Sequence, residues 1–391
     1  MSEAYTNFDE YIRQGEPEKR LKADAWRVAI GLQAVDGLST SEYLRETARK
    51  NIEGEITIDE ARELVKQYYI TKTSHDEDDA NKEEADRVSS NISKLLQTDA
   101  FTYSVAGLAA IHRAIFEGIF KHAGSFRNFD ISKKEWVLEG DSVIYARWQE
   151  LQMTLEYDLK QENQFVYSNL EKGQMVEHVA RFVSGLWQIH PFREGNTRTI
   201  AIFVVKYLRS LGFSVDNDMF ANHSWYFRNA LVRANYRNVA KGIECTPVYL
   251  ERFFRNLLLG EQWDLRNRYL HIHPTAEWSV QPNLADPTST PTSTPTSASV
   301  SLLNPDSKFY TKNNNIIELV RVVGCEEMSI KQMMEARVLK DRKNFINYHL
   351  EPAMKERFVR MKYPDCPNHP RQRYLLTVKG VALYNELIKP Q

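Results

Sequence analysis

Nine consecutive residues, from His190 to Arg198, bring together several groups that phosphate chemistry uses. Besides the imidazole and the guanidinium, they supply a carboxylate (Glu194), a glycine turn (Gly195) and an amide (Asn196). The stretch lies between two apolar runs of helical spacing, so it forms a loop that leads into a buried helix. Unpaired backbone N–H groups and the helix dipole favour an anion at such a terminus. The residue types and their position therefore predict a phosphate site.

Two helices must position this loop. Apolar residues repeat every three or four positions through 175–189 and again through 199–211. Pro191 ends the first helix, because proline lacks the N–H that a helix interior needs.

The composition limits the class of protein. The chain has 391 residues, enough for two or three domains, and its formal net charge of −1 argues against polyanion binding by the whole molecule. Its three cysteines are too scattered for a disulfide framework. No apolar run reaches the ~18 residues of a membrane span. We therefore expect a soluble, cytoplasmic protein with no membrane partner.

The sequence divides into four parts. We expect an N-terminal helical segment over 1–72, a helical domain over 73–275, a linker over 276–303 and a small domain over 304–391. The linker is the most distinct part, because its Pro/Ser/Thr repeat has almost nothing to bury. The predicted fold class is mainly α, with one β-hairpin in the main domain and an α+β C-terminal domain.

Local patterns predict helix starts in the N-terminal segment. The pairs Ser39/Glu42 and Thr57/Glu60 match the capping box, in which each side chain satisfies an orphan N–H of the other residue. The acidic stretch 73–86 is expected to be a solvated linker or helix start.

One segment of the main domain has a β-pattern. The runs 136–138 and 143–145 flank a turn-rich tetrapeptide, Glu-Gly-Asp-Ser, which predicts a β-hairpin within 126–145. A hairpin alone in a helical domain buries little surface, so we expect it to serve as a flap over a site.

The C-terminal domain has the element order of a winged helix, namely three helical runs, strand, loop, strand and helix. From Asn304 onward it contains sixteen Lys/Arg and ten Asp/Glu, so its charge is about +6 and that of the remainder about −7. A basic surface on one small domain suits nucleic acid, although many winged helices bind only protein. DNA is therefore a candidate partner.

The nonapeptide closely resembles the signature of the Fic family, HxFx(D/E)GN(G/K)R, and the resemblance extends through most of 88–260. It implies a Fic-type helical domain that transfers a nucleotide. Most often the family moves AMP from Mg-ATP to a Ser, Thr or Tyr hydroxyl of a protein, which can be the enzyme itself. ATP and Mg²⁺ are therefore the expected substrate and cofactor.

The resemblance also implies a role for each residue of the loop. His190 would be the general base that takes the proton of the incoming hydroxyl. Glu194 would ligate Mg²⁺. Phe192 would point into the core and fix the loop. Backbone N–H groups would form an anion nest, and amide and guanidinium groups would hold phosphate oxygens. The expected nucleotide-binding residues of the loop are Gly195, Asn196, Thr197 and Arg198.

Residues outside the loop are implied as well. The flap of Fic proteins pairs with the target backbone like an added strand and aligns its hydroxyl. Lys133, Lys134 and Trp136 stand where flap residues would face nucleotide or target, with plain packing of Trp136 as an alternative. Asn235 is the candidate for a hydrogen bond to the adenine edge, with an ordinary helix-surface asparagine as the alternative.

Two positions depart from the family pattern. Many Fic proteins have a second arginine three residues after the first, where this chain has Ala201, and Thr197 replaces the usual Gly or Lys. The change at 201 removes a charge-assisted contact to the γ-phosphate that is worth about 1.5–3 kcal/mol. Doc-like relatives also lack this arginine and are kinases, so a Doc-like protein kinase is an alternative function.

Residues 44–69 look like the antitoxin module that silences Fic proteins. Glu53 matches the end of its inhibitory pattern, (S/T)xxxE(G/N), whereas Arg49 stands where Ser or Thr is expected. Because Ala201 removes the usual partner, we expect Glu53 to point toward Arg198 or another arginine and to inhibit weakly. A plain role in the helix C-cap is the alternative.

A different class of function is a transcriptional regulator, in which the Fic domain senses a nucleotide and the winged helix binds DNA phosphates. The basic residues that could meet DNA are Lys331, Arg337, Lys340, Arg342 and Lys343. The oligomeric state stays open, a homo-oligomer included.

Overall fold

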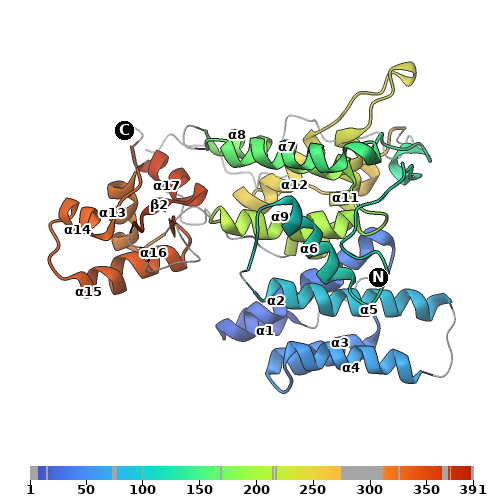
Figure 1. Cartoon of the computed structure of the whole chain (residues 1–391), viewed down its shortest axis with the longest axis horizontal. Helices are drawn as coiled ribbons and strands as arrows, with labels where there is room; N and C mark the ends of the chain where they lie inside the picture. Colours follow the sequence, from blue (N-terminus) through green and yellow to red (C-terminus); the bar gives the residue numbers. More distant parts are fainter. Residues whose placement is uncertain are drawn as a thin grey trace, which may run out of the picture.

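The computed structural model describes residues 8–14, 16–72, 77–98, 100–167, 170–213, 215, 218–273, 311–324, 326–362, 369 and 371–388. These residues form helices with one pair of short strands (Figure 1). The prediction of a mainly α protein with a small α+β domain at its C-terminus is confirmed. The expected linker over 276–303 lies outside the described residues. Among the described helices, none combines the length and apolar character needed to cross a bilayer.

The N-terminal helices pack around α2, which belongs to two hydrophobic cores. Their bounds are α1 (Asp9–Gln14), α2 (Pro17–Gly31), the 3-10 turn η2 (Leu32–Asp36), α3 (Glu42–Glu53), α4 (Ile58–Thr71) and α5 (Glu77–Leu96). Trp26 of α2 is buried in a small core with α3 and α4, whereas Val28 and Leu32 belong to the main core. The expected segment 1–72 is thus joined to the main domain through α2.

The helix starts of this region follow the predicted chemistry in one case of two. At α4, the Thr57 hydroxyl accepts from the N–H of Glu60 (3.2 Å) and the Glu60 carboxylate accepts from the N–H of Thr57 (2.7 Å), so the predicted capping box is present. At α3 the predicted cap, Ser39, is wrong. Ser41 caps this helix instead, through its hydroxyl and the N–H of Leu44 (3.1 Å).

Asp86 anchors Ser41 in that position. The acidic stretch 73–86 is predicted to be a solvated linker or a helix start, and α5 does begin within it, at Glu77, but Asp86 of that helix is fully buried. Its carboxylate accepts hydrogen bonds from the backbone N–H of Ser41 (2.8 Å), the Ser41 hydroxyl and the Tyr69 hydroxyl (2.7 Å). Burial raises the pKa of Asp86, and these three donors oppose that shift. One carboxylate of this acidic stretch, that of Asp86, is therefore buried and has a structural role.

The main helical body is built around α9 (Asn196–Ser210), the helix that follows the His190 loop. Every residue from Asn196 to Leu208 is buried, which is the pattern of a helix enclosed on all sides. The helices that surround it include α5 and α8 (Figure 1). The other helices of this body are α6 (Val105–Phe116), α7 (Leu151–Gln164), α8 (Lys172–Ile189), α10 (Asp218–Asn222), α11 (Ser224–Asn235) and α12 (Val248–Leu259).

The predicted β-hairpin over 126–145 is wrong in its secondary structure. This segment, which the structure describes completely, contains no strand, and residues 136–138 form a 3-10 turn, η3. The chain does reverse direction, because the N–H of Glu135 donates to the carbonyl of Asp141 (3.0 Å). A ladder does not extend from that bond, since the N–H of Lys133 donates to the Ser142 hydroxyl (3.1 Å) rather than to a carbonyl. We refer to residues 126–150 as the reversal segment.

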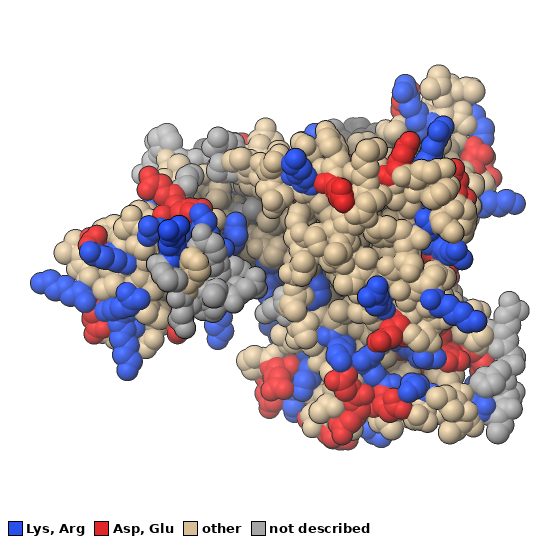
Figure 2. All heavy atoms as spheres, in the orientation of Figure 1, with Lys and Arg blue, Asp and Glu red and all other residues tan. Residues whose placement is uncertain are grey.

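The C-terminal domain has the expected order of elements. It comprises α13 (Asn314–Val323), α14 (Ile330–Ala336), α15 (Arg342–Phe345), a π-helical turn (Ile346–Leu350), α16 (Glu351–Lys355), β1 (Val359–Met361), β2 (Tyr374–Leu376) and α17 (Val378–Ile388). The two strands are antiparallel, with Val359 opposite Leu376. Lys and Arg side chains cover much of the visible face of this lobe (Figure 2). Its assignment as a winged helix and its binding to DNA stay predictions.

Candidate active site

The His190 loop joins α8 to α9 through two residues with left-handed backbone. His190 follows the last residue of α8 with a φ of 51°, and Gly195 caps α9 with a φ of 71°. Between them Phe192 is fully buried and its ring stacks on the ring of His112 at 3.8 Å, as expected for a core residue. The loop is therefore held from inside the core.

His190 has the protonation state that a general base needs. Its Nδ1 lies 3.3 Å from the carbonyl of Trp187, and a carbonyl only accepts, so Nδ1 carries the hydrogen. The lone pair is then on Nε2. The side chain is 3% exposed. Burial, together with the nearby positive charge of Lys133, lowers the pKa of His190 well below its ordinary value, which keeps the ring neutral.

Gly195 is required at its position for two reasons. Its positive φ is unfavourable for residues with a side chain. In addition, a Cβ at this position would lie 2.1 Å from Cζ of Phe116 on α6. The start of α9 thus lies so close to α6 that only glycine fits at position 195.

Asn196 and Thr197 hold the loop to its neighbours. The Asn196 side chain accepts from the N–H of Phe192 (2.9 Å) and donates to the carbonyl of the same residue (2.7 Å). The Asn196 amide has a second N–H, which remains available to a phosphate. The Thr197 hydroxyl accepts from the indole N–H of Trp187 (3.0 Å), which ties α9 to α8. This contact gives the threonine that departs from the family pattern a structural role.

Arg198 is buried among acids from the N-terminal helices. The side chain is 2% exposed. It donates to Glu84 of α5 (2.7 Å) and to the amide oxygen of Gln33 in η2 (3.0 Å). Its Nε also lies 2.8 Å from the Asp36 carboxylate. This contact is an ion pair and not a hydrogen bond, because the N–H of Nε does not point at the carboxylate oxygen. Its expected phosphate contact would thus compete with these partners. Three residues further on, Ala201 is fully buried in the main core.

Glu53 lies elsewhere, which corrects the expectation that it points toward Arg198. Its carboxylate accepts from Nζ of Lys19 on α2 (2.9 Å) and from the Tyr11 hydroxyl, and these two donors lower its pKa. It follows that Glu53 fastens α3 to α1 and α2. The structure brings Asp36 and Glu84 to the arginine instead.

Glu194 and the lysines of the reversal segment form the exposed edge of the site. The Glu194 carboxylate is 58% exposed and lies 3.2 Å from Nζ of Lys133. Lys134 is exposed. Among the described residues, no three His, Cys, Asp or Glu side chains cluster in a way that could hold a metal ion. A single exposed carboxylate still fits Mg²⁺, which commonly binds one or two carboxylates together with substrate phosphates and water.

Two expected contact residues lie at the periphery. Trp136 is 44% exposed, and its ring packs edge-on against His271 at 5.5 Å. The side-chain amide of Asn235 donates to the carbonyls of Ser184 (3.2 Å) and Leu231 (2.9 Å), so it connects α11 to α8. The contact of Trp136 is compatible with its alternative, a packing role, whereas the amide of Asn235 links two helices and its contact with adenine stays a prediction.

Comparisons with known sequences identify the central part of the chain. Residues 102–208 match the model of the Fic/DOC family, and residues 314–377 match the C-terminal domain of Fic-like proteins, described as filamentation induced by cAMP protein Fic-like. Residues 102–208 are a Fic/DOC family domain. The Fic domain thus runs from the residues before α6 to the buried part of α9 and contains the His190 loop.

Two relatives carry names that state an activity. The protein adenylyltransferase VbhT of Bartonella schoenbuchensis is 24% identical over 196 residues, which are 46% of this chain and 39% of that protein. The probable protein adenylyltransferase Fic of Escherichia coli is 28% identical over 120 residues, 30% of this chain and 56% of that protein. The chain thus spans 39% and 56% of the lengths of these two relatives.

Solved structures of Fic proteins are more distant. A Fic family protein from Desulfovibrio desulfuricans G20 is 16% identical with a TM-score of 0.39, covering 95% of this chain and 91% of that one. BepC of Bartonella tribocorum, solved with AMPPNP, is 20% identical with a TM-score of 0.36, covering 46% and 87%. Scores this low carry no conclusion about this chain.

Arg127 is a positioning residue of the Fic domain that sequence patterns did not reveal. Its side chain is 2% exposed, and Nε donates to the carbonyl of His190 (2.8 Å). The other nitrogens donate to carbonyls of the reversal segment, those of Phe129 (2.8 Å) and Ala146. The guanidinium therefore fastens the reversal segment to the loop of the general base. Its neighbours in sequence give no sign of this, because the contacts to the loop and to Ala146 are made with backbone carbonyls far away in the chain.

His112 is a second such residue. Its Nδ1 accepts from the N–H of Gly124 (2.8 Å), so its Nε2 carries the hydrogen that is donated to the carbonyl of Glu194 (3.1 Å). Burial lowers its pKa to about 4, and the neutral ring therefore persists at physiological pH. One imidazole thus holds the backbone of the loop while the other is available for chemistry.

Proposed function

We propose that this protein transfers AMP from Mg-ATP to a hydroxyl side chain of a target protein, which can be the protein itself. The relatives named protein adenylyltransferases support this reaction class. The observation that carries it is the buried, neutral His190, which has its lone pair on Nε2 and belongs to the loop that leads into the N-terminus of α9. A base and an anion site then share one loop.

The reaction follows from these two groups. Nε2 of His190 takes the proton of the target hydroxyl while the oxygen of that hydroxyl attacks the α-phosphorus of ATP. The bond from that phosphorus to the bridging oxygen of pyrophosphate breaks, and pyrophosphate leaves. Backbone N–H groups at the start of α9 and the second amide N–H of Asn196 would stabilise the charge on the α-phosphate. Mg²⁺, when bound, would neutralise phosphate charge. Glu194 would hold the ion once Lys133 moves aside.

The target would dock on the reversal segment. Its exposed Trp136 and Lys134 offer an apolar and a cationic contact, and its extended arms offer main-chain groups for pairing. Because Arg127 joins this segment to the carbonyl of His190, a docked chain would be placed relative to the base.

The reaction class can be tested with labelled ATP. We expect label from α-labelled ATP, in the presence of Mg²⁺, to appear on the protein itself or on an added partner, and chelation of Mg²⁺ to prevent it. Intact mass should show the gain of one AMP. If label arrives only from γ-labelled ATP, the protein is a kinase, and the AMP-transfer proposal fails.

We also propose that Asp36 and Glu84 restrain this activity. After the change at 201, Arg198 is the one residue of this chain that matches an arginine of the family pattern, and its guanidinium is engaged by both acids and by Gln33. A phosphate could recruit it only by displacing those contacts. The restraint would thus come from η2 and α5 rather than from Glu53, which binds Lys19.

The isosteric double variant Asp36→Asn/Glu84→Gln should raise the initial rate of self-AMPylation about threefold or more. Its amides keep the shape of the acids but lose the charge that holds the guanidinium, so phosphate competes better. The melting temperature should fall, because a buried arginine that loses its ion pairs is destabilising by up to ~3–5 kcal/mol.

Glu53→Gln is the matched control, since it neutralises an acid of the same segment that pairs with Lys19 instead. Its rate should equal that of the parent. A rate for the double variant at or below that of the parent would rule out this restraint. A large rate increase in Glu53→Gln would return the role to Glu53.

A further inference from the structure

Glu135 is a buried carboxylate at the point where the reversal segment turns. The residue is 1% exposed. Its N–H donates to the carbonyl of Asp141 (3.0 Å), and its own carbonyl accepts from the N–H groups of Leu138 (3.1 Å) and Gly140 (3.0 Å). Every residue type carries these backbone groups, so the turn itself does not explain why a carboxylate is buried here.

The carboxylate of Glu135 is paired with an arginine of another helix. Its Oε2 lies 2.7 Å from Nη1 of Arg228 on α11. Burial raises the pKa of Glu135, and the positive charge of Arg228 opposes that shift. A buried ion pair is often no more stabilising than apolar side chains of the same volume. Stability alone therefore does not account for this pair.

Tyr145 connects the carboxylate to the general base. It lies on the other arm of the reversal segment, and its buried hydroxyl donates to Oε1 of Glu135 (3.4 Å). Its ring packs against the imidazole of His190, with 4.2 Å between the ring centroids and 34° between the planes. The indole of Trp187 meets the same imidazole edge-on at 5.1 Å. The base is thus held between two aromatic rings, of which Tyr145 belongs to the reversal segment.

The orientation of the imidazole decides where the Nε2 lone pair points. The hydrogen bond from Nδ1 of His190 to the carbonyl of Trp187 is 3.3 Å long, beyond the usual 2.7–3.2 Å for an N–H donor. That bond alone holds the ring weakly. A ring packed against the imidazole restricts its rotation further. Proton transfer needs Nε2 within hydrogen-bond reach of the target hydroxyl, and a misplacement of ~1 Å can cost ~10²-fold in rate.

We propose that Glu135 is a positioning residue for the general base. It holds Tyr145 against His190, and Arg228 supplies the counter-charge that keeps the buried carboxylate ionised. The effect on rate rests on the proposed AMP transfer, whereas the effect on the orientation of the imidazole does not.

The kinetics of self-AMPylation test whether Glu135 acts through Tyr145. Glu135→Gln and Tyr145→Phe should each lower the maximal rate at least about threefold and leave the half-saturating ATP concentration unchanged, because they loosen the base and not the nucleotide. The double variant should be no slower than the slower single variant, since both changes break one chain of contacts. Tyr145→Leu removes the ring itself and should lower the maximal rate about 10²-fold.

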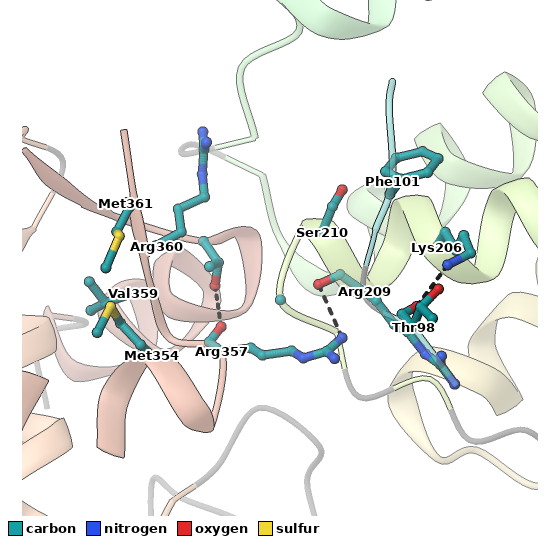
Figure 3. A pocket seen from close by; sticks show the side chains of 12 residues that line it. Thr98, Phe101, Lys206, Arg209, Ser210, Met354, Arg357, Val359, Arg360 and Met361 are labelled. Atoms are coloured by element: carbon teal, nitrogen blue, oxygen red, sulfur yellow. Dashed lines mark hydrogen bonds between the residues drawn. The ribbon is translucent and has the colours of Figure 1, made fainter. Parts of the chain in front are cut away.

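Glu162→Gln is the matched control. Glu162 is also a buried carboxylate of the Fic domain that accepts from tyrosine hydroxyls, one of them that of Tyr207 on α9. Tyr207 follows Lys206, which lines a cavity at the end of α9 opposite to the His190 loop (Figure 3). This variant removes a buried charge in the same way as Glu135→Gln, but far from the base, so its maximal rate should equal that of the parent.

The orientation of the imidazole can be measured without ATP. Nuclear magnetic resonance of the full chain with isotopically labelled histidine reports the ring nitrogens, and those of His190 are assigned by their loss in His190→Ala. The parent should show a neutral ring with its hydrogen on Nδ1. These signals should shift or broaden in Glu135→Gln and in Tyr145→Leu, and stay in place in Glu162→Gln.

Two results would overturn the proposal. The first is unchanged ring signals of His190 in both Glu135→Gln and Tyr145→Leu, whether or not the parent transfers AMP. The second is a loss of rate in Glu162→Gln as large as that in Glu135→Gln, which would assign the loss to stability. If the ring signals respond as expected but the parent transfers no AMP, the positioning role stands and the proposed function fails.

Discussion

His190→Ala should lose AMP transfer by about 10²–10⁴-fold, the usual contribution of a general base. His112, whose imidazole contacts the loop, carries its hydrogen on the nitrogen that faces the carbonyl of Glu194 and cannot substitute. Intact mass after incubation with Mg-ATP should show one added AMP in the parent and none in the variant. Circular dichroism would confirm that the variant is folded.

His349→Ala is the control for this experiment, because His349 lies in the C-terminal domain, outside the Fic domain. It should keep the rate of the parent. Transfer by His190→Ala within about threefold of the parent would show that His190 is not the base.

The pH dependence of the parent should reflect the burial of His190. Its pKa is lowered from the ordinary 6.5, first by burial and then by Lys133, so the base stays unprotonated at pH values where an exposed histidine is charged. We therefore expect the transfer rate to fall only below about pH 6.5. In Lys133→Met the loss of positive charge raises the pKa of His190, so the fall should begin at a higher pH.

Gly195→Ala should destabilise the Fic domain by about 2–5 kcal/mol and abolish transfer. A left-handed backbone costs a residue with a side chain ~1–2 kcal/mol, and overpacking of a core typically costs a further ~1–3 kcal/mol. The new methyl group would overlap the Phe116 ring, whose Cζ lies 2.1 Å from the Cβ position. Thermal unfolding monitored by circular dichroism would measure the effect.

Gly260→Ala separates the two causes. Gly260 ends α12 with a φ of 72°, nearly the same as Gly195, but a Cβ there meets nothing within 4 Å. It should therefore show only the backbone cost, with a small fall in melting temperature. Equal falls for the two variants would mean that the contact with Phe116 is not what requires glycine at position 195.

The features of the site that could be predicted from the sequence are those that depend on residues close together in the chain. The His190 loop and the two helices that flank it depend on spacing within some forty residues, and the structure contains them. The burial of Phe192, which the resemblance to the Fic family implies, is also present. The strands around Val359 and Tyr374 were predictable for the same reason, since alternation of apolar residues needs only a short window.

The partners of charged side chains were not predictable. Arg198 pairs with Asp36 and Glu84, which are more than one hundred residues away, and local patterns cannot reveal such pairs. Arg127 likewise binds carbonyls, which every residue type carries. The reversal segment does not form a hairpin because the N–H of Lys133 donates to the hydroxyl of Ser142. In a hairpin, this N–H would donate to a backbone carbonyl of the facing strand.

The complete burial of Ala201 has a consequence for how this Fic domain could change. Position 201 has no exposed surface, so an arginine placed there would need room inside a packed core and would leave its charge without solvent. Overpacking and desolvation of the charge each cost several kcal/mol. No single substitution can therefore reinstate the second arginine of the family pattern. In the proposed reaction, the γ-phosphate of ATP would therefore be held by groups that the common motif does not contain.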